Sequence, residues 1–366
     1  MLVYHVWKLG APDGQPMDLV GVRSVAPHLW NGVTLFFVLS GFLLFRPFVS
    51  AVTRGSPLPK FRRYFANRAL RILPAYWVIL LVVGLVLDAA LLRGPQGRYY
   101  EGGMNAGELL LSAAFLQNYS EQTLYTGIAP AWSLAVEVVW YLLLPLLALV
   151  AAGAAVRART AAGRTRAVLL PVALMIALAM SGKAAALLVI DWSTGVERSL
   201  WGTADFFAYG MVVAVVGVEL EEGRLQLPSW WRRAAAGALV ALILLAVVFG
   251  VSNLDPGNVR NYAYNVAMAL ACALLLALVV LPDERTSRRP PLVRVLDSRV
   301  LTAIGVASYS LFLWHEPIAW WLRNQGLTAE RMAGTCLQSR HRRRGERRVG
   351  GADLSGNRTP CPAAAP

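Results

Sequence analysis

Charged residues are scarce in this chain. Only 15% of its 366 residues are charged, 57% are hydrophobic, and the mean hydropathy is +0.50. Because a soluble domain carries about 25% charged residues, the composition excludes a soluble globular domain of useful size. Several apolar windows exceed the roughly 20 residues that cross a bilayer. We therefore expect an all-α fold, a polytopic membrane helical bundle embedded in the lipid bilayer.

Cysteines are few, and motifs for tightly bound groups are absent from the sequence. Cys272, Cys336 and Cys361 have no metal-binding spacing and form no even disulfide framework. No Gly-rich phosphate loop, metal triad or nucleophile elbow occurs. The net charge of +14 at first suggests nucleic acid, but it is better explained by loop arginines that orient membrane spans. We expect no metal, no bound cofactor and no nucleic-acid partner.

The apolar runs predict eight full spans and a partial first span at residues 1–7. Residues 107–118 are too short to cross a bilayer, so we expect a re-entrant or interfacial segment there. Loops on one side hold 18 basic residues and loops on the other side hold six, which predicts that the arginine-rich side is cytoplasmic. The predicted full spans are residues 33–52, 74–92, 128–150, 167–190, 201–218, 234–251, 262–282 and 300–321.

The C-terminal end breaks this charge pattern. We expect a membrane domain at residues 1–327, followed by a basic tail at 328–366 that lacks hydrophobic periodicity. The tail could be disordered, or it could bind lipid or nucleic acid. The interpretation we favour is a shifted coding frame near residue 330, because a translocated basic tail contradicts the preceding loops.

Glu137 is the most unusual residue of the apolar runs. A carboxylate at mid-membrane depth is costly, and it usually faces a cavity or a partner and marks a functional site. Ser133, Glu137 and Tyr141 are spaced four residues apart, so they share one helix face. The alternative is a structural hydrogen bond that holds two helices together.

Five segments, in order, resemble acyltransferase family 3, whose integral membrane members include bacterial O-antigen and exopolysaccharide O-acetylases. Residues 3–7 (VYHVW) are similar to the end of the family's first span. Residues 32–47 contain "FFVLSGFL", and residues 61–77 are close to the pattern "RRxxRIxPxY". Residues 132–145 and, more weakly, residues 304–317 complete the set. The resemblance covers residues 2–327, but the family's first-span arginine and its last span are missing, so we expect truncation at both ends and an inactive or unstable chain.

The resemblance implies an O-acyltransferase in the bacterial inner membrane. It would move an acyl group, with acetyl as the expected one, from acyl-CoA as co-substrate to a hydroxyl of a carbohydrate or glycolipid acceptor. His5 is the candidate general base, because an imidazole has a suitable pKa; a capping histidine is the alternative. Glu137 would orient this histidine or hold the acceptor.

Further residues are candidates for binding. Arg68 and Arg71 lie one turn apart at the expected cytoplasmic mouth of a span, where guanidinium groups suit the phosphates of coenzyme A; topology alone would also place arginines there. His315 could be a polar site or a structural hydrogen bond beside Pro317. The residues expected to line the substrate site are Ser40, Trp132, Ser133, Tyr141 and His315.

A different class of function stays open. In a transporter or channel, the ionisable residues within spans would form a substrate pathway, although we find no internal repeat of the kind such folds often contain. Lys183 and Asp205 are also intramembrane candidates, but they belong to no matched segment and could lie near an interface.

Overall fold

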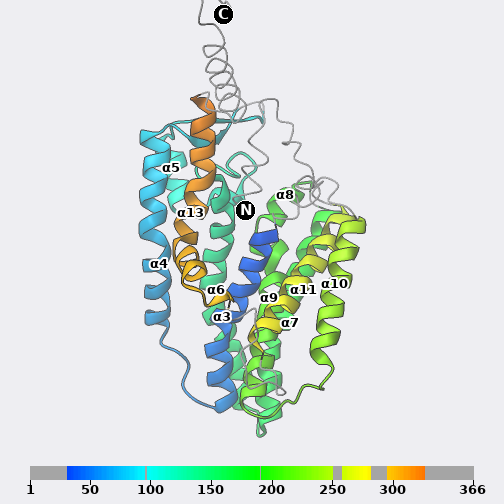
Figure 1. Ribbon diagram of the computed structural model, residues 1–366. Helices are drawn as coiled ribbons and strands as arrows, with labels where there is room; N and C mark the ends of the chain where they lie inside the picture. Colours follow the sequence, from blue (N-terminus) through cyan, green and yellow to red (C-terminus); the bar gives the residue numbers. More distant parts are fainter. Residues whose placement is uncertain (1–30, 95–96, 190, 250–257, 282–294, 326–366) are drawn as a thin grey trace, which may run out of the picture.

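The structure, a computed structural model, describes residues 31–94, 97–189, 191–249, 258–281 and 295–325. Within these residues it is a bundle of long helices, which confirms the predicted all-α membrane fold (Figure 1). The predicted first partial span at residues 1–7 and the basic tail at 328–366 lie outside the described residues.

A long helix occurs at each of the eight predicted spans. Six helical segments of the described residues are long and apolar enough to cross a membrane by length and composition, and α10 and α13 occupy the other two predicted positions. The long helices are α3 (Gly32–Arg54), α4 (Phe61–Leu81), α6 (Trp132–Val156), α7 (Ala161–Leu188), α9 (Leu200–Glu221), α10 (Trp231–Phe249), α11 (Val259–Val280) and α13 (Arg299–Asn324).

The second predicted span, residues 74–92, has the wrong boundaries. Helix α4 begins at Phe61, passes through Pro74 and continues as the π-helical turn η2 (Val82–Val86). Proline is tolerated inside membrane helices because neighbouring groups satisfy the freed backbone atoms. Arg68 and Arg71 therefore lie inside α4. At 1.5 Å per residue they are about 10 Å and 15 Å from the start of the helix at Phe61. Their expected position at the cytoplasmic mouth of the span stays a prediction.

Short elements gather at one end of the bundle, which we call the hairpin end (Figure 1). Strand β1 (Ala90–Arg93), part of the predicted second span, pairs antiparallel with β2 (Tyr99–Gly102). The predicted interfacial segment forms α5 (Ala106–Ala113), capped by Asn105 and Glu108, and η3 (Gln117–Tyr119). Helix η4 (Ala129–Ala131) leads into α6, and α8 (Ser193–Glu197) precedes α9.

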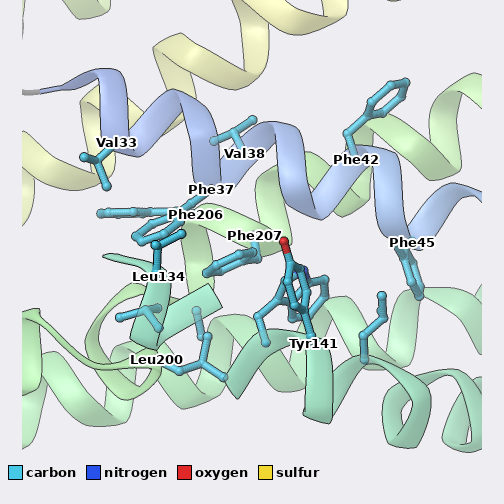
Figure 2. Close-up of a cluster of buried hydrophobic side chains, with 14 of the residues drawn as sticks. Val33, Phe37, Val38, Phe42, Phe45, Leu134, Tyr141, Leu200, Phe206 and Phe207 are labelled. Atoms are coloured by element: carbon cyan, nitrogen blue, oxygen red, sulfur yellow. The ribbon is translucent and has the colours of Figure 1, made fainter. Parts of the chain in front are cut away.

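Helices α3 and α9 meet backbone to backbone in the core. A methyl group added at Gly210 would collide with the carbonyl oxygen of Val38, and one added at Gly41 would collide with the backbone of Phe207. Small residues at helix crossings permit such close approach. Beside this crossing, Phe37 stacks on Phe207 with ring centroids 4.8 Å apart (Figure 2). This contact fixes the position of α3, the helix that carries Ser40.

Candidate active site

Four helices, α3, α4, α6 and α13, surround a cavity of about 520 Å³, which we call the main cavity. Its volume is in the range of small-molecule binding sites. One part of its lining is apolar: Val33, Phe36, Leu39, Leu43, Leu44, Ile72, Leu134, Ile304, Leu311 and Phe312. The polar and charged lining residues are Ser40, Arg68, Arg71, Ser133, Glu137, Tyr141, Ser308, Tyr309 and His315.

A buried hydrogen bond joins two walls of the main cavity. The Ser40 hydroxyl donates to Oε1 of Glu137 over 2.6 Å, and the two side chains come from α3 and α6. Glu137 is 2% exposed, so its carboxylate is almost fully removed from solvent. A charge-assisted hydrogen bond of this kind offsets part of the cost of burying the carboxylate. The bond also fixes the orientation of Glu137 towards α3.

The predicted shared face of α6 is confirmed. Ser133, Glu137 and Tyr141 all line the main cavity. The Ser133 hydroxyl donates to the carbonyl oxygen of Pro130 over 3.1 Å, at the start of the helix. The Tyr141 carbonyl oxygen accepts a hydrogen bond from the Tyr64 hydroxyl of α4. The spacing of four residues therefore identified side chains that lie together, although Ser133 already has a local structural partner.

Positive charge lies in the same cavity, on α4. Arg68 and Arg71 both line it, and the Arg68 guanidinium lies 6.0 Å from the centroid of the Tyr141 ring. Nε of Arg68 is buried and has no hydrogen-bond partner among the residues that the structure describes. A buried guanidinium donor of this kind is suited to an anionic group or a carbonyl oxygen of a ligand.

Helix α13 supplies a histidine and a tyrosine. Nδ1 of His315 lies 2.6 Å from the carbonyl oxygen of Phe312. A carbonyl can only accept, so Nδ1 donates, and in the neutral ring Nε2 is then an acceptor. Both predicted interpretations of His315 hold in part, because it lines the cavity and makes a structural hydrogen bond. The Tyr309 hydroxyl donates to the carbonyl oxygen of Ile72 over 2.9 Å, which ties α13 to α4.

The structure brings together seven of the nine residues expected in the site: Ser40, Arg68, Arg71, Ser133, Glu137, Tyr141 and His315. Trp132 does not line the main cavity and instead borders a smaller cavity beside it. His5 lies outside the described residues, so its role as a base stays a prediction. Sequence reasoning did not single out Tyr309, although it lies in the weakest of the five matched segments.

Lys183 and Asp205 form a buried ion pair, with Nζ 2.7 Å from Oδ1. Asp205 is fully buried in the protein, and both residues lie near the ends of α7 and α9, so the expectation of a position near an interface stays a prediction. Their helices, α7 and α9, are not related by any spacing in the sequence, so the pairing could not be foreseen. In the described part of the chain, no group of three or more His, Cys, Asp or Glu residues could hold a metal ion.

Comparisons with known proteins agree with this architecture. The acyltransferase-3 family, described as an acyltransferase domain, matches residues 18–330. A Komagataeibacter xylinus protein named as a membrane-bound transacylase, BcsY, is 27% identical over 84% of this chain and 73% of its own length. A Bacillus subtilis protein named as a peptidoglycan O-acetyltransferase, YrhL, is 26% identical over 78% of this chain.

This chain spans 44% of the length of YrhL. No solved structure gives a significant match. The family match covers most of the chain, and the helices have the length and composition of a multi-pass membrane protein. The chain therefore belongs to the acyltransferase-3 family, and it is a membrane acyltransferase that transfers groups other than aminoacyl groups.

Proposed function

We propose that the chain transfers an acetyl group from acetyl-CoA to a hydroxyl of a carbohydrate or glycolipid at the bacterial inner (plasma) membrane. The observation that carries this proposal is the buried Ser40–Glu137 pair in a cavity that Arg68 and Arg71 also line. The cavity thus combines a negative group with positive groups and an apolar lining. In this proposal the positive groups serve the thioester donor, and the negative group serves the hydroxyl acceptor or the base.

The donor interacts with α4 in this proposal. Arg68 and Arg71 bind the phosphates of coenzyme A through charge-assisted hydrogen bonds. Nε of Arg68, which finds no partner in the described part of the chain, supports this role, since a ligand would satisfy it. The two arginines line the main cavity, so the phosphate groups reach that cavity in this proposal.

The acceptor hydroxyl attacks the carbonyl carbon of the thioester. A C–O bond forms, the C–S bond breaks, and the coenzyme A thiolate takes up a proton to leave as the free thiol. The hydroxyl proton passes to a general base, a step that typically contributes 10²–10⁴-fold to the rate. His5 is the predicted base. Glu137 orients that base or holds the acceptor hydroxyl, and Ser40 keeps the carboxylate in place.

The experiment is an assay of thiol release from acetyl-CoA by the purified chain in lipid nanodiscs. We expect release that rises when soluble oligosaccharides are added as acceptors, and a loss of about 100-fold in Glu137→Gln. Glu108→Gln is the matched control, because Glu108 caps α5 outside the cavity. A wild-type chain that releases no thiol from acetyl-CoA under any acceptor condition would contradict the proposal.

A further inference from the structure

A second, smaller cavity lies beside the main cavity at the hairpin end of the bundle, and we call it the niche. Its volume is about 30 Å³. A water-sized group needs roughly 10–15 Å³ by this measure, so the niche accommodates about two such groups. The helix ends around it belong to α3, α6, α7, α9 and α11, together with α8. Its charged lining residues are Lys183, Glu197 and Arg198.

The charged residues of the niche are held in fixed orientations. The Arg198 guanidinium lies 4.3 Å from the centroid of the Trp132 ring, and its Nε donates to the Tyr125 hydroxyl over 2.9 Å. Oε1 of Glu197 accepts a hydrogen bond from Nδ2 of Asn261 over 2.8 Å. Binding groups that are already oriented lose little conformational entropy when a ligand arrives.

Lys183 contributes to the niche from α7. Its Nζ donates to Oδ1 of Asp205 over 2.7 Å and to the carbonyl oxygen of Gly202 over 2.8 Å. An ammonium group has three donors, and beyond these two bonds Nζ lies 5.5 Å from the centroid of the Phe206 ring, which also lines the niche. Buried ionisable residues in membrane proteins are costly and commonly mark a substrate path or binding site.

The charge balance of the niche indicates which ligand it fits. Lys183 is offset by Asp205, and the positive Arg198 is offset by the negative Glu197, so the four formal charges sum to zero. An anion such as phosphate gains little from a neutral site. A hydroxyl both donates and accepts hydrogen bonds, and the niche is lined by a residue with a carboxylate, Glu197, and by two with cationic donors, Lys183 and Arg198.

The niche and the main cavity are separated by one layer of residues. Val33 lines both of them. Trp132 lines the niche, whereas Ser133 and Leu134, the next residues of α6, line the main cavity. A polyhydroxylated molecule with one hydroxyl in the niche therefore lies beside the cavity where the proposed transfer takes place.

We propose that the niche is an acceptor subsite that binds hydroxyl groups of the carbohydrate acceptor, with Glu197 and Arg198 as its specificity-determining contacts. This inference rests on the proposed function. It gives Trp132 a role as a wall of the acceptor subsite, and it gives Lys183 and Asp205 a role in shaping that subsite. The donor binds elsewhere, in the main cavity with Arg68 and Arg71.

The test compares Glu197→Gln and Arg198→Ala with the wild-type chain in nanodiscs. Arg260→Ala is the matched control, because Arg260 is an exposed arginine of α11 at the same end of the bundle and does not line the niche. The probes are acetyl-CoA and a panel of soluble methyl glycosides. The measured quantities are the KM for the best wild-type glycoside, the KM for acetyl-CoA, and thioester hydrolysis without glycoside.

We expect the glycoside KM to rise about tenfold or more in both niche variants, as the loss of a hydrogen bond to a charged group predicts. The acetyl-CoA KM and the hydrolysis rate should stay within about twofold of wild type, and Arg260→Ala should change nothing. A parallel fall in hydrolysis would assign Arg198 and Glu197 a structural role and overturn the inference. An unchanged glycoside KM would also overturn it.

Failure of the inference can be told apart from failure of the proposed function. If the wild-type chain hydrolyses acetyl-CoA but acylates no glycoside, the result supports the donor site. It contradicts the carbohydrate acceptor and therefore also the niche inference. A wild-type chain that does not hydrolyse acetyl-CoA contradicts the donor itself. Normal glycoside transfer with an unaffected KM in the variants contradicts the niche alone.

Discussion

The Ser40 hydroxyl of α3 donates a 2.6 Å hydrogen bond to the Glu137 carboxylate of α6 inside the main cavity. The two residues are 97 positions apart in the chain, and both are buried. The bond links the helix that crosses the core to the helix that supplies the carboxylate. The position of a charged group in the cavity therefore depends on a serine of another helix.

Replacing Ser40 by alanine removes the donor to Glu137 and leaves the carboxylate buried with one partner fewer. Because hydrogen bonds to charged groups contribute about 1.5–3 kcal/mol, we expect acyl transfer to fall by roughly ten- to 100-fold. The matched control is Ser308→Ala, since Ser308 also lines the cavity but its hydroxyl donates to Gly305 of its own helix. The measurement is the steady-state rate of acyl transfer by each variant. An equal loss of this rate in both variants would contradict a specific role for Ser40.

Arg68→Ala should weaken donor binding. Loss of a charge-assisted hydrogen bond predicts that the KM for acetyl-CoA rises about tenfold or more. Arg68→Lys should restore only part of this loss, because an ammonium group cannot form two parallel hydrogen bonds with a phosphate. Arg62→Ala is the control, as Arg62 is exposed on the same helix and does not line the cavity. If Arg62→Ala and Arg68→Ala raise the KM alike, the arginines act through general surface charge.

Gly210→Ala should separate α3 from α9. The added methyl group meets the carbonyl oxygen of Val38, and overpacking of this kind costs about 1–3 kcal/mol or more. We expect a lower Tm in a thermal melt of the nanodisc-embedded chain. Gly217→Ala, on the same helix, meets only Leu281 Cδ2 at 3.5 Å and should leave the Tm unchanged or slightly higher. Equal Tm values for the two variants would contradict the tight crossing.

Lys183→Met should destabilise the fold more than a double replacement of the ion pair. Removing one partner leaves the Asp205 carboxylate buried and unpaired, which costs about 3–5 kcal/mol. The double variant Lys183→Met, Asp205→Leu replaces both charges by apolar groups and should recover most of the lost Tm. If the double variant is less stable than Lys183→Met, the two residues do not act as a pair.

Much of the fold could be predicted from the sequence, because apolar length and helical spacing are local properties. All eight helices and the shared face of Ser133, Glu137 and Tyr141 follow from them. The second span was placed too late because its apolar run continues into β1, and an apolar run alone does not distinguish a helix end from a buried strand. The same misplacement put Arg68 and Arg71 before the start of the predicted span, whereas α4 begins at Phe61 and contains both.

Contacts between helices could not be predicted in the same way. Ser40 was expected to line the substrate site, but its bond to Glu137 depends on how α3 and α6 pack, and that in turn depends on the glycine crossing of α3 with α9. The Lys183–Asp205 pair and the position of Trp132 beside Arg198 also depend on packing. A single sequence carries no spacing signal between residues of different helices.

The most direct test of the central claim follows labelled acetyl groups from acetyl-CoA to an oligosaccharide, with the wild-type chain and Glu137→Gln assayed side by side. The account predicts that the wild-type chain labels the oligosaccharide and releases one thiol for each acetyl group transferred. It predicts that Glu137→Gln folds normally and labels about 100-fold less. Labelling by Glu137→Gln at the wild-type rate would contradict the claim that this buried carboxylate belongs to the active site.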